Sequence, residues 1–314
     1  MRTEAVAADP GTPEAAASAA TQAPALWPGL ALAMAGSIAF SGKAIIVKLA
    51  YRHGVDAVTL IMYRMLFALP LFALLAWWSG RGEPALTRRD WLVVCGLGFS
   101  GYYLASFLDF AGLVYITASL ERLILYLNPT LVLAIGALFL KRRVTQRQMI
   151  ALAVSYCGVL LVFGHEVSFQ GGDTALGAGL VFASALSYAV YLVASGEEVG
   201  RLGALRLTGL ATSVACLFCI AQFLLLRPLT ALAVAPEVIW LSVLNATLCT
   251  FAPVVMVMMA IERVGASVAA QTGMIGPLST ILMGVVILGE PFTAWILAGT
   301  VLVLSGIWLL TKWR

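Results

Sequence analysis

Ten apolar runs of about 20 residues follow one another along this chain, with few charges inside them. Only 11% of the residues are charged, against about 25% in soluble domains, so water cannot solvate most of the surface. We therefore predict an all-α integral membrane protein. Its ten transmembrane helices are expected near residues 28–50, 57–78, 91–112, 117–140, 147–164, 176–195, 205–226, 238–261, 265–288 and 294–311.

Basic residues concentrate in alternate loops between these runs. The segments on the side of the N-terminus hold 13 of them: Arg2, Arg81, Arg88, Arg89, Lys141, Arg142, Arg143, Arg147, Arg201, Arg206, Arg263, Lys312 and Arg314. The opposite loops hold Arg52 and Arg227, with Lys48 at a helix end. By the positive-inside rule this asymmetry predicts that both termini are cytoplasmic. We expect a multi-pass protein of the bacterial inner membrane.

The segment before the first run differs in composition. Residues 1–27 are rich in Ala, Thr and Pro, which is typical of a disordered tail. No apolar stretch follows a basic start as it does in a cleaved signal peptide, so we expect the first run to be kept as a helix.

Several functional classes lack support in the sequence. The five cysteines lie inside apolar runs, where Cys216 and Cys219 are expected to pack between helices rather than do redox work. No metal site or cofactor motif is evident, and no nucleotide-binding loop is present. No basic stripe that would bind nucleic acid occurs either.

The two halves of the chain repeat each other at a spacing of 148 residues. Eight identities relate residues 118–162 to 266–310, among them Pro129 with Pro277 and Gly158 with Gly306. Because each copy holds five expected spans, an odd number, the second copy must enter the membrane from the opposite side. Inverted repeats are a recurring transporter architecture with the solute site between the halves.

The residues around these repeats resemble a known family. The run ASLERLILYLNP from Ala118 to Pro129, followed by LKRRVT to Thr145, looks like the end of an EamA domain of the drug/metabolite transporter superfamily. The second copy, with GP at Gly276 and LGEP ending at Pro291, fits better, and Arg64 lies where such domains often carry an arginine. The first copy has Lys-Arg where Gly-Glu is usual.

This resemblance implies two EamA-like repeats, residues 28–164 and 165–314, that enclose a central cavity. Members of the superfamily carry very different solutes, so the resemblance does not name a substrate.

Ionisable residues inside a membrane are functional candidates by default. Five qualify, all in the first half: Lys43, Arg64, Asp109, Glu121 and Arg122. We expect Arg122 to pair with Asp109, leaving Glu121 to face the cavity. Two structural alternatives stay open: Arg64 can extend to the membrane surface, and the Asp109–Arg122 pair can be purely structural.

Uncharged polar and aromatic side chains complete the set of candidates for solute contact. They are Tyr102, Tyr126, Asn128, Tyr188, Tyr191, Asn245 and Gln271. Any of them can instead join helices through hydrogen bonds or packing. Pro129 and Pro277 are expected to kink their helices, either as hinges or as static bends.

These features favour a secondary transporter, a monomeric exporter of a small organic solute such as an amino acid, another metabolite or a drug. A proton gradient acting through Glu121 or Asp109 is one candidate driving force, and facilitated diffusion is the other. A channel or a non-transporting scaffold is the alternative. A membrane enzyme has less support, because the only histidines, His53 and His165, fall in predicted loops.

Overall fold

A computed structural model describes residues 13–139, 145–170, 173–272 and 275–312, and within these residues the fold is helical without strands. The first half contains α1 (Pro13–Tyr51), α2 (Ala57–Ser79), α3 (Arg88–Leu97), η1 (Gly98–Leu104), α4 (Ala105–Leu113), α5 (Ala118–Leu125), α6 (Asn128–Phe139) and α7 (Gln146–Gln170). The second contains α8 (Asp173–Leu202), α9 (Ala204–Leu226), η2 (Leu229–Leu232), α10 (Pro236–Ala246), η3 (Thr247–Phe251), α11 (Ala252–Thr272), α12 (Ile275–Met283), η4 (Gly284–Leu288) and α13 (Ala294–Lys312).

The described residues contain eight helices that are long and apolar enough to cross a membrane. Two shorter apolar helices cover Ile275–Leu288 and Ala294–Leu309. The expected ninth span was placed wrongly at its start, because α11 continues from the eighth span to Thr272. Ala and Met residues favour helix there, and the charged pair at Glu262 and Arg263 does not interrupt it.

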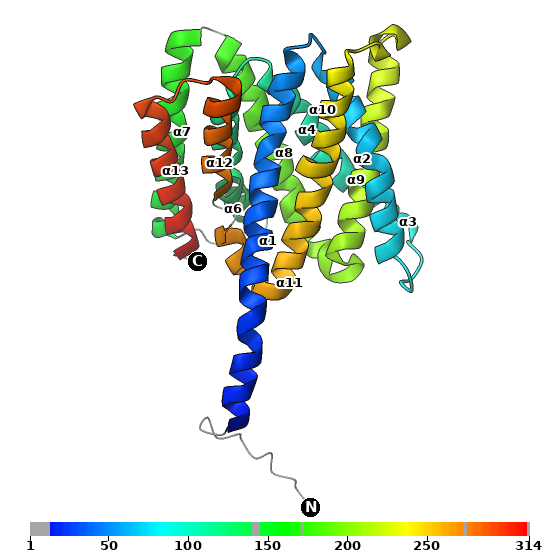
Figure 1. The fold of residues 1–314 in the computed structure, drawn as a ribbon, viewed down its shortest axis with the longest axis vertical. Coiled ribbons are helices and arrows are strands. Elements are labelled where there is room, and N and C mark those ends of the chain that lie inside the picture. Colours follow the sequence, from blue (N-terminus) through cyan, green and yellow to red (C-terminus); the bar gives the residue numbers. More distant parts are fainter. Residues whose placement is uncertain (1–12, 140–144, 171–172, 273–274, 313–314) are drawn as a thin grey trace, which may run out of the picture.

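The expected disordered tail is helical in part. Helix α1 begins at Pro13 and extends well beyond the bundle (Figure 1), while residues 1–12 lie outside the described part of the chain. Alanine has the highest helix propensity, and proline is tolerated in the first turn of a helix. The Ala-rich composition that we interpreted as a tail therefore also suits a helix.

Contacts between helices repeat at the 148-residue spacing. A Cβ at Gly158 of α7 would lie 2.7 Å from the carbonyl oxygen of Gly299 in α13, and a Cβ at Gly306 would lie 2.7 Å from that of Ala151. Exchanging the halves converts one contact into the other. Helices α7 and α13, side by side in Figure 1, thus cross through equivalent small residues.

A second pair of interfaces follows the same relation. Gly112 of α4 lies against Val181 of α8, and the equivalent positions, Ala260 of α11 and Ala33 of α1, belong to one buried cluster. Residues at equivalent positions of the two halves therefore lie at equivalent helix contacts.

Pro129 lies at a helix start rather than inside a helix. Helix α5 ends at Leu125, and α6 begins at Asn128, directly before Pro129. Proline has no N–H to donate to the carbonyl four residues earlier, so the helix stops and restarts instead of bending. Pro277 likewise lies in the first turn of α12. The expected kink at Pro129 is thus a break in the helix.

The two halves also share π-helical segments at matching positions. Segments η1 and η3 occupy Gly98–Leu104 and Thr247–Phe251, which overlap when one is shifted by 148 residues. In η3 the Thr250 hydroxyl donates to the carbonyl of Asn245 over 2.8 Å. Such segments interrupt regular helical packing and are frequent at functional sites.

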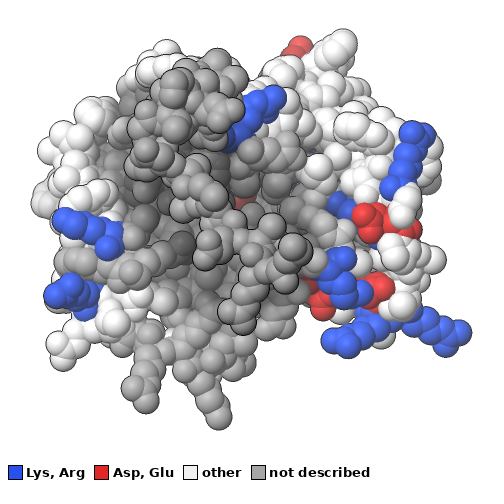
Figure 2. All heavy atoms as spheres, turned by 90° about the horizontal axis from the view of Figure 1, so that it is seen from below, with Lys and Arg blue, Asp and Glu red and all other residues white. Residues whose placement is uncertain are grey.

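One end of the bundle carries the chain termini, and we call it the terminal face. Figure 2, which views this face, shows Lys and Arg side chains around its rim, with acidic side chains among them on one side. Arg201 of α8 pairs there with Asp90 of α3 over 2.5 Å and with Glu198 over 2.6 Å. The opposite end, which carries the loops at residues 52–56, 114–117 and 289–293, we call the distal face.

Candidate functional site

A cavity of about 360 Å³ lies inside the bundle. This volume is within the range of small-molecule sites, roughly 300–1,000 Å³. Its lining consists of Phe40, Lys43, Arg64, Phe72, Gly101, Tyr102, Ala105, Ser106, Asp109, Arg122, Leu125, Tyr126, Asn128, Pro129, Ser184, Tyr188, Thr250 and Val254. Both halves contribute, but every charged residue in this lining belongs to the first half. Segments η1 and η3 and the α5–α6 break all border the cavity.

Lys43 lies at the centre of a buried ionic group. Its Nζ lies 2.5 Å from Oδ2 of Asp109 and 3.2 Å from Oε1 of Glu121. Asp109 and Glu121 are 2% and 0% exposed, so neither carboxylate has bulk water as a partner. The expected pair of Asp109 with Arg122 is therefore wrong, because α1 inserts the ammonium of Lys43 between the two carboxylates.

Glu121 does not face the cavity as expected. It lies beside Lys43, it is fully buried, and it is not among the residues of the lining. Leu125 and Asn128, whose spacing of four and seven residues would place them on the same helical face as Glu121, do line the cavity. Leu125 belongs to the same helix as Glu121, whereas Asn128 follows the break that ends α5, and the sequence did not reveal this break.

Arg64 lies in the interior rather than at the membrane surface. Its Nε donates to Oγ1 of Thr250 over 3.1 Å, and its guanidinium lies 5.1 Å from the centre of the Phe110 ring. The side chain is buried, and its Nη1 has no hydrogen-bond partner. Arg64 thus joins α2 of the first half to η3 of the second, and no carboxylate among the described residues pairs with it.

Arg122 makes the corresponding link between α5 and α12. Its Nε donates to Oγ1 of Thr280 over 2.9 Å, and its Nη2 donates to the carbonyl oxygen of Phe40 over 3.2 Å. It also has no carboxylate partner within 4.0 Å in the described part of the chain. Two cavity arginines are therefore held by neutral groups.

Tyrosines form one wall of the cavity, as the sequence suggested. Tyr102 and Tyr188 line it, and Tyr191 packs behind them with its hydroxyl 3.3 Å from that of Tyr102. The ring centres of Tyr102 and Tyr191 are 5.1 Å apart, and those of Tyr188 and Tyr191 are 5.5 Å apart. A Cβ at Gly101 would lie 2.3 Å from the Tyr191 ring, so only glycine permits this packing.

The remaining candidates divide between the cavity and its surroundings. Tyr126 and Asn128 line it, and the amide oxygen of Asn128 is buried without a hydrogen-bond partner. Asn245 is buried outside the lining. The side chain of Gln271 lies outside the described residues.

Sequence reasoning missed the apolar part of the lining. Phe40 and Phe72 line the cavity, but an aromatic residue in an apolar run usually reads as packing. One signal was available for Phe40. It lies three residues before Lys43, and residues at this spacing share a helix face.

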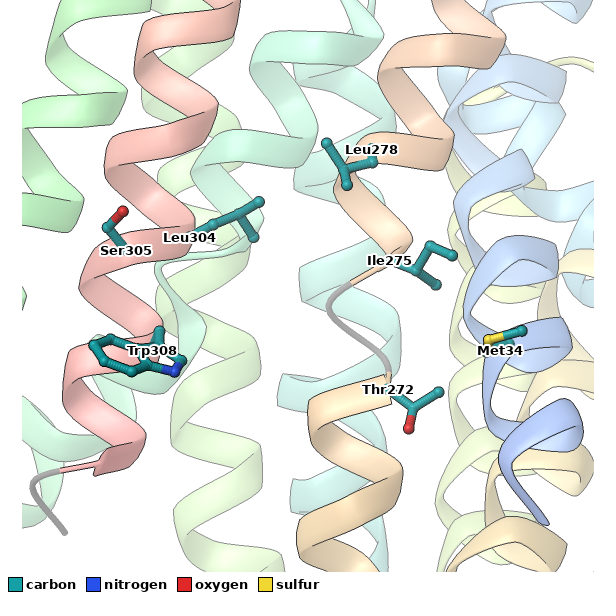
Figure 3. A pocket seen from close by; sticks show the side chains of 7 residues that line it. All are labelled: Met34, Thr272, Ile275, Leu278, Leu304, Ser305 and Trp308. Atoms are coloured by element: carbon teal, nitrogen blue, oxygen red, sulfur yellow. The ribbon is translucent and has the colours of Figure 1, made fainter. Parts of the chain in front are cut away.

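A second hollow, about 590 Å³, lies toward the outside of the bundle. Figure 3 shows the seven side chains that line it, on helices α1, α11, α12 and α13. They are Met34, Thr272, Ile275, Leu278, Leu304, Ser305 and Trp308. This lining has no charged group and only two hydroxyls, which suits contact with lipid. The central cavity is therefore the candidate solute site.

Interactions at the distal face connect the two halves. The carboxylate of Glu290 accepts hydrogen bonds from the backbone N–H of Ala118 over 2.7 Å and from the hydroxyl of Ser119 over 2.9 Å. It thereby caps the N-terminus of α5, where a negative charge is favourable. Nearby, the guanidinium of Arg52 donates to the carbonyl oxygen of Leu288 over 2.7 Å.

Asp56 makes another distal connection. Its Oδ1 accepts a hydrogen bond from Nε of Arg227 over 3.1 Å. Partial burial would raise the pKa of Asp56, but hydrogen bonds from Thr59 and Arg227 outweigh it and hold the pKa below its usual value. The carboxylate therefore stays charged at neutral pH and ties the start of α2 to the end of α9.

A bundle with eight candidate membrane spans around a cavity lined by charged and aromatic side chains is typical of multi-pass membrane transporters. Comparison with known proteins identifies the family: the EamA-like transporter family matches residues 27–164 and, a second time, residues 175–312. The chain belongs to this family, which confirms the resemblance that its sequence carries.

The relatives are named as transporters, and the matched region covers most of this chain and most of each relative. The chain is 30% identical over 267 residues to the uncharacterized transporter YcbK of Bacillus subtilis, covering 83% of this chain and 86% of that protein. It is 22% identical to the uncharacterized transporter YetK of the same organism, covering 90% of this chain and 86% of that protein. An uncharacterized transporter of Archaeoglobus fulgidus is 25% identical, covering 72% of this chain and 79% of that protein.

A crystal structure of a protein with 15% identity has the same fold. The TM-score is 0.62, with 91% of this chain and 96% of that chain covered. The family match, the relatives named as transporters and the apolar helices together show that the chain is a multi-pass membrane transporter.

Proposed function

We propose that this chain is a secondary transporter that exports a small organic solute by alternating access through the central cavity. The proposal includes ten spans in two inverted five-helix halves, cytoplasmic termini and a monomeric protein in a bacterial inner membrane. The observation that carries it is the central cavity itself. Both halves line it, and Arg64 and Arg122 join one half to the other at its wall.

The arrangement of the halves supports alternating access over a channel. Contacts related by the exchange of the halves would allow one packing to convert into its counterpart on the other side of the membrane. The distal connections made by Glu290 and Asp56 would break when the distal face opens. Pro129 and Pro277, at the starts of α6 and α12, are proposed hinges for this motion.

A carboxylate pair around one lysine supports proton coupling. Asp109 and Glu121 share Lys43, so a proton taken up by one carboxylate would release the ammonium toward the other. Facilitated diffusion would leave transport independent of the pH gradient.

Flux into proteoliposomes tests this function. Labelled amino acids, organic acids and amines would be supplied with and without a pH gradient. Ser106→Trp fills the cavity, and Leu225→Trp, at a position that is 83% exposed, is the matched control. We expect saturable flux of at least one solute in the wild type and the control and its loss in Ser106→Trp. Equal flux in all three proteins, or none for any solute, would contradict the proposal.

Labelling tests the orientation. In a background without native cysteines, Glu83→Cys and Phe292→Cys would place single thiols on the terminal and distal faces, where both positions are exposed. A maleimide that cannot cross the membrane should label only residue 292 in intact cells. Labelling of both thiols from the outside would refute the inverted arrangement.

A further inference from the structure

The charges around the cavity do not balance. Lys43, Arg64 and Arg122 supply three positive charges, and Asp109 and Glu121 supply two negative ones. With every group ionised the cluster carries one net positive charge, and protonation of either carboxylate raises it. A charge buried in a medium of low dielectric constant is costly unless it is paired. This cluster therefore lacks an anion.

The two carboxylates are already used by Lys43. The ion-pair distances of 2.5 Å and 3.2 Å leave that ammonium engaged by both. Arg64 instead donates to a threonine hydroxyl and lies over an aromatic ring. Arg122 donates to a threonine hydroxyl and a backbone carbonyl. The unpaired charge thus lies on the arginines, whose planar guanidinium groups suit bidentate binding of a carboxylate or another oxyanion.

The rest of the lining describes the body of the ligand. Phe40, Phe72, Tyr102 and Tyr188 bring aromatic surface to the same cavity, and Leu125 adds aliphatic surface. A small hydrated ion such as phosphate would gain little from this surface. An organic molecule with an apolar or aromatic body would bury this apolar lining of the cavity away from water.

We infer that the cavity binds an organic anion, whose anionic group is held by Arg64 or Arg122 and whose apolar body packs against the aromatic wall. This inference rests on the proposed function, because it names the class of solute for the same cavity. It also gives the solute a role in the motion. Each arginine reaches from the first half to a threonine of the second, so an anion that competes for the guanidinium would alter the contacts between the halves.

Binding of a matched set of ligands to the purified full chain in nanodiscs tests this inference by calorimetry. The set contains 3-phenylpropionate, its amide, 3-phenylpropylamine, the zwitterion phenylalanine, acetate and inorganic phosphate. We expect the carboxylate with the phenyl ring to bind at least about tenfold more tightly than each of the others, which corresponds to about 1.4 kcal/mol.

Variants locate the anionic group. Arg64→Gln and Arg122→Gln remove the two candidate charges, and Arg64→Lys keeps a charge but not the planar geometry. Arg263→Gln, on an exposed arginine outside the cavity lining that donates to the Met259 carbonyl, is the matched control. We expect at least one of the glutamine variants to weaken 3-phenylpropionate binding about tenfold or more, Arg64→Lys to retain part of any Arg64 contribution, and the control to bind like the wild type.

The outcomes separate the two proposals. Equal or tighter binding of the amine, amide or zwitterion, no measurable binding of the carboxylate, or unchanged binding in both glutamine variants would overturn the inference. Saturable flux of cations alone, blocked by Ser106→Trp, would leave the transport proposal standing while the anion inference fails. Arginine-dependent binding of the carboxylate without flux of any solute would do the reverse.

Discussion

Replacing Lys43 by methionine removes the one ammonium between two buried carboxylates. Met has a similar length and no charge, so the change isolates electrostatics from packing. Asp109 and Glu121 would face each other without a cation, at 2% and 0% exposure. Removing one partner from a buried ion pair costs about 3–5 kcal/mol. At roughly 2–4 °C per kcal/mol, the melting temperature should fall by roughly 6–20 °C.

The other members of the group should behave differently. Asp109→Asn leaves Lys43 paired with Glu121 at 3.2 Å, so it should cost less than Lys43→Met. The triple variant Lys43→Met, Asp109→Asn, Glu121→Gln also removes the two carboxylates that Lys43→Met leaves without their ammonium, so it should recover part of the loss. Non-additivity of about 0.5–3 kcal/mol is expected for groups in contact.

Heating in detergent followed by size-exclusion chromatography measures the melting temperatures. Lys312→Met is the control, since this lysine is exposed and lies over the Trp308 ring. A Lys43→Met protein that melts like the wild type would refute the reasoning. So would a triple variant that melts below Lys43→Met, because the two carboxylates without their ammonium could then not be the cause of the lower melting temperature.

Two further variants address packing and capping. Gly158→Ala should destabilise the protein by about 1–3 kcal/mol, because its Cβ would lie 2.7 Å from the backbone oxygen of Gly299. The control Gly164→Ala, with open space at the Cβ, should be neutral or slightly stabilising. Equal melting temperatures for the two variants would show that α7 and α13 do not pack this closely. Glu290→Ala removes the acceptor for Ala118 N–H and the Ser119 hydroxyl and should cost about 1–2 kcal/mol, which the same melting assay measures. An unchanged melting temperature for Glu290→Ala would mean that this cap does not stabilise the distal contact.

The sequence by itself determined that most of this protein lies in a lipid bilayer, and it determined the order of the membrane spans. An apolar run long enough to cross a bilayer is a local property, so most predicted boundaries fall within a few residues of the helices, as for 57–78 and α2. The matched glycines and prolines are also local, and they revealed the relation between the halves. The family resemblance rests on the same short motifs.

Only the tertiary structure decided which charges meet. Three helices, α1, α4 and α5, bring Lys43, Asp109 and Glu121 together, and no spacing in the sequence records that Lys43 rather than Arg122 reaches Asp109. The direction of a side chain across a bundle depends on helix rotation and on the break before Asn128. Depth in the membrane follows from counting residues, whereas pairing depends on distances of a few ångströms between segments far apart in the chain, and packing alone sets these.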